Sequence, residues 1–169
     1  NNYLTQKIPK KERKRMDQLL LKSLAAYDSY DHYFGITPEF IRDKQEILLE
    51  AGQLQKAVKE GDRLVLKYPT KFEYILINAS LYSTLGKHQE AVTYLLQKRN
   101  ENEDYHLTLT LITNYEKLGE TEKVNTEIST LINNENVPIQ ERLNILVKLI
   151  KSTSEASSME FILELTKQL

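Results

Sequence analysis

The sequence predicts an all-α fold in which one long helix precedes about four helix pairs. Three observations predict it: apolar residues recur at helical spacing, strand-like alternation is never sustained, and breaking residues are few and regularly placed. The chain has 169 residues with only five glycines and four prolines. Its abundant Leu, Ile, Lys, Glu and Gln favour helix over sheet.

The first predicted helix spans roughly residues 10–33, where Met16, Leu20, Leu24 and Tyr27 recur at spacings of four, four and three. Such a stripe is typical of an amphipathic helix. Glycine and proline then divide the chain into short helices, because glycine accepts a left-handed C-terminal turn and proline fits a first turn. The predicted pairs are 38–51 with 54–67, 71–85 with 88–99, 103–118 with 121–133, and 139–152 with 156–168.

The breaks repeat with a period near 34. Gly52 and Gly86 are 34 residues apart, and Gly86 and Gly119 are 33 apart. The neighbours at fixed distances also match: Leu48, Tyr82 and Tyr115 come four positions before a glycine, and Ala57, Ala91 and Val124 come five after. A helix–turn–helix unit of this length indicates a repeat protein in which stacked units bury each other's apolar sides.

These residues resemble the tetratricopeptide repeat (TPR) family. The best copy carries Ala79, Tyr82, Gly86, Ala91 and Leu95, and the resemblance extends over residues 38–169. It implies a right-handed superhelical solenoid that forms one continuous domain. The repeats would be 38–70, 71–103, 104–137 and 138–169, behind a basic capping helix in residues 1–37.

Two positions depart from the family pattern. Ile75 stands where the best copy would carry the usual Trp, and Gly61 takes the place equivalent to Leu95. A glycine within a helix costs about 1 kcal/mol relative to alanine. We therefore expect Gly61 to allow a close contact between helices.

The resemblance also implies a concave groove lined by the first helix of each pair. Some family members hold a peptide carboxylate there with Lys and Asn, whereas this chain offers mainly Glu, Ser and Thr. A neutral or basic protein segment is therefore the expected partner. The matching groove positions are Glu39, Arg42, Glu46, Glu50, Glu73, Leu76, Ser80, Ser83, Thr84, His106, Leu109, Thr113, Glu116 and Lys117.

The histidines favour structural roles over chemistry. His88 has only Gln89 and Glu90 nearby in sequence, so we interpret it as a solvated surface residue rather than a general base. Glu103 and His106 have the spacing of di-iron helices, but that chemistry needs a second such pair.

Asp28, Asp31 and His32 share one helix and offer too few ligands for a metal. We predict no metal, cofactor or small-molecule substrate, and no enzymatic activity.

Two N-terminal features leave alternatives open. Tyr27, Tyr30, Tyr33 and Phe34 form an aromatic stripe that we expect to pack under the first repeat, the alternative being an exposed partner anchor. Residues 1–22 hold seven basic and two acidic residues, a local charge of +5. The alternative function is therefore binding of nucleic acid or anionic lipid through this basic helix.

Asn78 fits a glycosylation sequon but stands at an expected half-buried helical position, so we discount modification there. The chain has no cysteine and a net charge of −1, which excludes thiol chemistry and gives no general attraction to nucleic acid. No apolar run is long enough to span a membrane.

The apolar residues Phe161, Ile162, Leu165 and Leu169 lead us to expect a segment of a longer array. The missing initiator Met and absent cysteine favour an exported bacterial protein slightly over a cytoplasmic one. The sequence thus predicts a protein–protein interaction scaffold.

Overall fold

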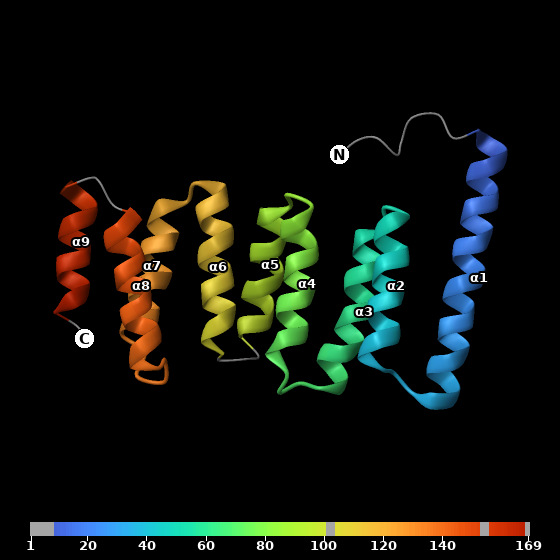
Figure 1. Cartoon of the computed structure of the whole chain (residues 1–169), viewed down its shortest axis with the longest axis horizontal. Helices are drawn as coiled ribbons and strands as arrows, with labels where there is room; N and C mark the ends of the chain where they lie inside the picture. The colour runs from blue at the N-terminus through green and yellow to red at the C-terminus, as the bar shows by residue number, and fades with distance from the viewer. Residues whose placement is uncertain (1–8, 101–103, 153–155, 168–169) are drawn as a thin grey trace. The chain divides into compact units, whose positions relative to one another are not determined.

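A computed structural model describes residues 9–100, 104–152 and 156–167 of the protein. Across these ranges the chain forms nine helices and no strand (Figure 1), so the predicted all-α class is confirmed. The helices match the predicted ranges to within two residues. They are α1 (Lys10–Phe34), α2 (Pro38–Glu50), α3 (Leu54–Lys67), α4 (Phe72–Thr84), α5 (His88–Arg99), α6 (Tyr105–Leu118), α7 (Thr121–Ile132), α8 (Ile139–Ser152) and α9 (Ala156–Thr166).

The chain divides into two compact units, residues 1–81 and 82–169, with the boundary inside α4. The first unit contains α1, α2, α3 and most of α4, and α1 packs against α2. The second contains the end of α4 and helices α5 to α9. No helix in the described ranges is both long and apolar enough to cross a membrane.

The three repeated glycines make the same turn. Gly52, Gly86 and Gly119 have φ angles of 71°, 71° and 72°, in the left-handed region. After each glycine, the next N–H donates to the carbonyl five positions back, which is the six-to-one bond of a Schellman turn. The pairs are Gln53 to Leu48 at 2.7 Å, Lys87 to Tyr82 at 2.9 Å, and Glu120 to Tyr115 at 3.0 Å. The period seen in the sequence is therefore a repeat of backbone geometry.

In the first unit, Gly61 brings α3 and α4 close together. A β-carbon at this position would collide with the side chains of Asn78 and Gln45, so the predicted close contact is confirmed. Asn78 itself is fully buried. The expectation that it is half-buried was wrong, because the space left by glycine admits a polar side chain into the interior.

Hydrogen bonds satisfy this buried amide. Asn78 Oδ1 accepts from Gln45 Nε2 at 2.9 Å, and its Nδ2 donates to the Val58 carbonyl and to Asp62 Oδ1, each at 3.2 Å. Gln45 Nε2 also donates to the Ala57 carbonyl at 3.1 Å. Buried amides persist only when paired in this way, and the bonds join α2, α3 and α4.

In the second unit, apolar residues from the end of α4 and from helices α5 to α9 form the core. Ala91 and Leu95 of α5 are fully buried, and Tyr82 packs near Tyr94 with ring centroids 6.1 Å apart. Further along, one cluster joins α6, α7, α8 and α9. Its buried members are Ile112, Ile128, Leu131, Ile132, Val137, Leu146 and Leu165.

Candidate functional site

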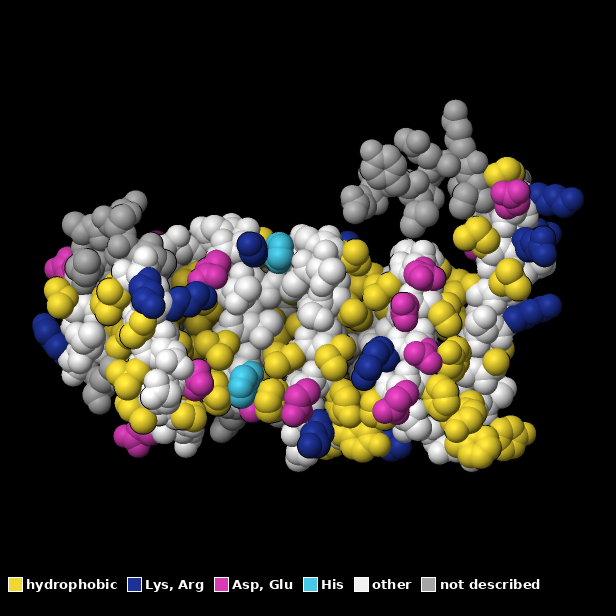
Figure 2. All heavy atoms as spheres, in the orientation of Figure 1, with side chains coloured by type: hydrophobic (Ala, Val, Ile, Leu, Met, Phe, Trp, Pro, Cys, Tyr) yellow, Lys and Arg dark blue, Asp and Glu magenta, His cyan; other side chains and the backbone are white. Residues whose placement is uncertain are grey.

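Four exposed carboxylates lie along one face of α2, and we call Glu39, Asp43, Glu46 and Glu50 the acidic row. They follow one another at spacings of four, three and four residues, which places them on a single helix face. Figure 2 shows the acidic side chains as a line along α2. Like charges three and four residues apart destabilise an isolated helix by about 0.2–0.5 kcal/mol per pair. Helix stability therefore does not explain the row.

One member of the row has a hydrogen-bond partner on α1. Asp43 Oδ2 accepts a hydrogen bond from Tyr27 Oη of α1 at 3.2 Å. Burial, the hydrogen bond and the charge of Asp43 raise the pKa of Tyr27 above its ordinary value. Glu39, Glu46 and Glu50 make no ion pair with any described residue. A cationic group from outside could approach these three carboxylates without displacing an internal partner.

The other border of the row faces α4. Arg42, which is exposed, lines a small cleft there together with Tyr74 and Ile77. The acidic row therefore runs between α1 on one side and α4 on the other, inside the first unit.

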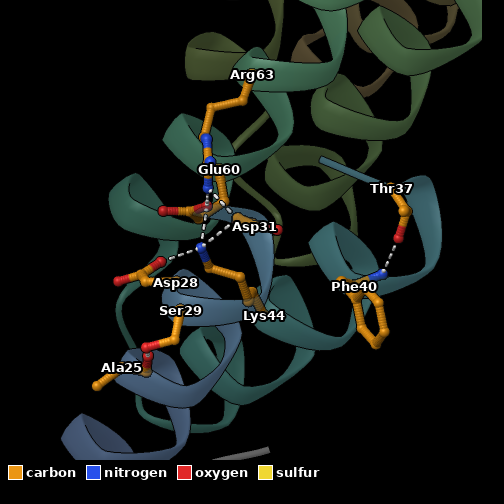
Figure 3. A network of polar contacts seen from close by, with 9 residues as sticks. All are labelled: Ala25, Asp28, Ser29, Asp31, Thr37, Phe40, Lys44, Glu60 and Arg63. Carbon is orange, nitrogen blue, oxygen red and sulfur yellow. Dashed lines mark hydrogen bonds and ion pairs between the residues drawn. The ribbon is translucent and has the colours of Figure 1, made fainter. Parts of the chain in front are cut away.

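On a different side of α2, a buried cation joins three helices (Figure 3). Lys44 is only 1% exposed, and its Nζ lies 2.5 Å from Asp28 Oδ1, 2.8 Å from Glu60 Oε2 and 3.3 Å from Asp31 Oδ2. Arg63 Nη1 lies 2.8 Å from Asp31 Oδ2 and 2.7 Å from Glu60 Oε2. These five residues form what we call the ion cluster, which connects α1, α2 and α3.

Opposing effects act on the pKa of Lys44, the cation at the centre of the ion cluster. Burial lowers the pKa of Lys44, but hydrogen bonds and charges of Glu60 and Asp28 raise it by more, so the pKa lies above its ordinary value. The two acids that the sequence placed near His32, Asp28 and Asp31, are therefore held by lysine and arginine. His32 is exposed and meets the ring of Tyr33 edge-on at 5.2 Å.

No group of three or more potential metal ligands occurs in the described ranges. An open hollow of about 610 Å³ lies beside the ion cluster, lined by Asp28, Asp31, His32, Arg63 and Lys67 among others. Its carboxylates are already paired with cations, and Lys67 Nζ donates to the Ile36 carbonyl at 2.7 Å. We therefore assign the hollow a structural role.

His88 differs from its prediction. It is half-buried, and its Nδ1 lies 3.0 Å from Asn114 Oδ1. Ser83 Oγ donates to the same oxygen at 2.8 Å. The interpretation as a solvated residue was wrong because His88, the first residue of α5, faces Asn114 of α6. An amide partner fixes the ring but supplies no acid or base.

His106 takes part in the cap of α6. Asp104 Oδ1 accepts from the His106 backbone N–H at 2.8 Å and lies 2.6 Å from its Nδ1. Glu103, the other half of the predicted metal spacing, lies outside the described residues.

The aromatic stripe is divided. Tyr27 and Tyr30 pack against Phe40 of α2, with ring centroids 5.7 and 4.2 Å apart. Tyr33 and Phe34 are 78% and 72% exposed, so the expectation that the whole stripe packs under the first repeat was wrong for this pair. They lie in the last turn of α1, where the ring of Phe34 contacts that of Tyr30 with centroids 4.4 Å apart. Among the described basic residues of α1, Lys11, Lys14 and Arg15 are exposed, and the nucleic-acid or lipid alternative stays a prediction.

The groove positions remain predictions, and the structure gives their exposure. Half-buried positions are Leu76, Ser83, His106 and Leu109; exposed ones are Glu39, Arg42, Glu46, Glu50, Glu73, Ser80, Thr84, Thr113, Glu116 and Lys117. Sequence reasoning missed Asp43 of the acidic row. Its distance of four residues from Glu39 was the signal that could have identified it.

The fold defines an all-α protein of TPR-like helical repeats. The crystal structure of MamA, a TPR-like helical repeat protein, matches with a TM-score of 0.51 and 15% identity, covering 96% of this chain and 95% of that chain. The structure of MamA 41-end from Desulfovibrio magneticus RS-1 matches with a TM-score of 0.49 and 13% identity, over 92% and 94% of the two chains. The first of these likenesses shows a shared fold. No protein-family profile and no curated protein matches the sequence.

Proposed function

We propose that this protein is a non-catalytic interaction scaffold of the TPR type whose acidic row binds a basic or neutral segment of a partner protein. The acidic row is the observation that carries the proposal. Three of its carboxylates have no internal cation in the described ranges, although the same unit pairs Asp28, Asp31 and Glu60 with buried or half-buried cations.

The fold supports an interaction role. TPR-like arrays present the first helix of each pair to a binding partner, and α2 is such a helix. The acidic row coincides with three of the groove positions that the TPR resemblance implies, Glu39, Glu46 and Glu50. Charged groups at the rim of an interface mainly determine association rate and partner choice, so a basic segment would be selected by charge.

Charge reversal tests the proposal. The variant Glu46→Lys/Glu50→Lys should bind a fluorescent lysine- and alanine-containing peptide at least tenfold more weakly than the wild type, as measured by anisotropy at low salt. Raising the salt should weaken wild-type binding, because exposed charges separated by more than about 10 Å are screened at 0.1 M. The variant should show little salt dependence.

Glu135→Lys/Glu164→Lys is the matched control, since it changes the net charge equally at two exposed residues of the second unit. It should retain wild-type affinity. Equal losses in both variants would mean that the peptide responds to net charge alone. Unchanged affinity of the Glu46/Glu50 variant would exclude the acidic row as the binding surface.

A further inference from the structure

Helix α8, the first helix of the final pair, exposes a stripe of apolar side chains. Ile139, Leu143, Val147 and Ile150 of α8 are 52%, 41%, 47% and 48% exposed, and they recur at spacings of four, four and three residues. Figure 2 shows hydrophobic side chains over α8. With a rise of 1.5 Å per residue, the stripe extends about 16 Å along the helix.

A second apolar side of the same helix already forms the core. Leu146 is buried in the cluster of the second unit, and Ile145 and Leu149 pack against it. The stripe is therefore additional to what the fold of this unit uses. Contiguous exposed apolar residues of this kind mark interaction sites in soluble proteins.

The repeat period relates the stripe to the predicted groove positions of α6 in the same unit. Leu143, Val147 and Ile150 stand 34 positions after Leu109, Thr113 and Glu116. At two of these positions α6 carries the polar residues Thr113 and Glu116, whereas α8 carries Val147 and Ile150. The two helices thus present different chemistry at equivalent positions, which favours a distinct ligand for α8.

Two lysines border the stripe. Lys148 and Lys151 are exposed, and neither makes an ion pair with a described residue. Together with Asn144 and Val147 they line an open hollow of about 460 Å³. The surface therefore combines an apolar band with positive charge that no described carboxylate pairs, and a complementary ligand combines apolar groups with carboxylates.

We propose that this surface binds an acidic amphipathic helix of a partner protein. Apolar side chains of that helix, spaced three and four residues apart, would cover the stripe, and its carboxylates would pair with Lys148 and Lys151. The proposal rests on the interaction role proposed above and adds a second surface whose ligand has the opposite charge. It does not depend on the acidic row.

The test uses two fluorescent helical peptides with the same leucine face, one with glutamate and one with lysine at the flanking positions. The full chain should bind the glutamate peptide in an anisotropy titration. Val147→Glu and Lys148→Glu/Lys151→Glu should each weaken this binding at least tenfold, and the lysine reversal should increase affinity for the lysine peptide. Should Val147→Glu lose helical content by circular dichroism, the isosteric Val147→Thr replaces it, with a smaller expected loss.

Leu66→Glu is the control, because Leu66 is 79% exposed on α3 in the other unit. It should leave the titration unchanged. Basic-peptide binding at the acidic row should also be unaffected by Val147→Glu, so the two proposals fail separately.

Several results would overturn the proposal for α8. They are no binding of the glutamate peptide, or unchanged affinity for the glutamate peptide after Val147→Glu. A dimer that sedimentation shows to dissociate in Val147→Glu would identify a second copy as the occupant. Binding to phosphatidylserine vesicles that is lost in Val147→Glu, without peptide binding, would identify a lipid surface.

Discussion

The side-chain oxygen of Asn78 occupies the space that a β-carbon at Gly61 would need. The two residues belong to the consecutive helices α3 and α4, and the residue type at each position depends on that at the other. Glycine at 61 leaves room for the amide, and the amide fills that room while bonding to Gln45, Val58 and Asp62.

Gly61→Ala should therefore destabilise the protein. Alanine favours an isolated helix by about 1 kcal/mol over glycine, but overpacking a filled interior costs about 1–3 kcal/mol. Urea unfolding should show a net loss of stability. In a double-mutant cycle with Asn78→Ala, the two losses should be less than additive, because removing the amide relieves the collision. A Gly61→Ala protein more stable than wild type would contradict the contact.

Lys44→Met should destabilise the protein. Leaving a fully buried charge without its partner costs about 3–5 kcal/mol. Here Asp31 and Glu60 would keep Arg63, and the acid that loses its cation, Asp28, is 64% exposed, so the loss should stay below that range. The measurement is chemical denaturation at neutral pH. Lys56→Met, at an exposed position of α3, serves as the control and should stay within about 0.5 kcal/mol of the wild type.

The contribution of Lys44 should disappear in alkali. Its folded-state pKa lies above the ordinary value of 10.5, so protonation is favoured by folding. The resulting stability is complete below that ordinary value and is lost as pH rises through the folded-state pKa. The difference in unfolding free energy between wild type and Lys44→Met should stay constant from about pH 7 to about pH 9 and shrink above about pH 10.5. A difference that grows with pH would contradict the assignment.

Asp104→Ala should shorten or weaken α6. Asp104 accepts from the His106 N–H at 2.8 Å, and the loss of such a cap costs about 0.5–2 kcal/mol. Asp104→Asn keeps an acceptor oxygen and removes only the charge, so it should recover most of the loss in thermal unfolding. If alanine and asparagine were equally harmful, the ion contact with the His106 ring would matter more than the cap.

The repeat was predictable because its signal is local. Gly52, Gly86 and Gly119 each need a left-handed backbone, and glycine supplies that conformation without strain. Helix bounds followed from the same punctuation and from the spacing of apolar residues.

The ion cluster was not predictable from the same signals. Lys44 and Gln45 belong to the buried stripe of α2 with Ile41 and Leu48, yet lysine is almost never fully buried unless paired. Its partners Asp28 and Glu60 are each sixteen residues away, on other helices. Nothing in the local pattern brings them together, because only tertiary packing does so.

The candidate surfaces lie between these cases. The TPR resemblance predicted Glu39, Glu46 and Glu50 as groove residues. It did not include Asp43, which belongs to the acidic row because its spacing from Glu39 places it on the same face of α2. The stripe on α8 was visible as periodic apolar residues, but periodicity alone does not distinguish an exposed face from a buried one. The exposed fractions of these α8 side chains in the structure show that the stripe is an exposed face.

The ion cluster also determines which residues α1 would need in order to pack in another helical repeat protein. Asp28 and Asp31 need the cations of α2 and α3, and a slip of α1 by one turn, about 5.4 Å, would move both acids away from them. If α1 were grafted onto another helical array, it should pack there only if Lys44, Glu60 and Arg63 were introduced at the equivalent positions. The transferable module is therefore α1 together with the first helix pair.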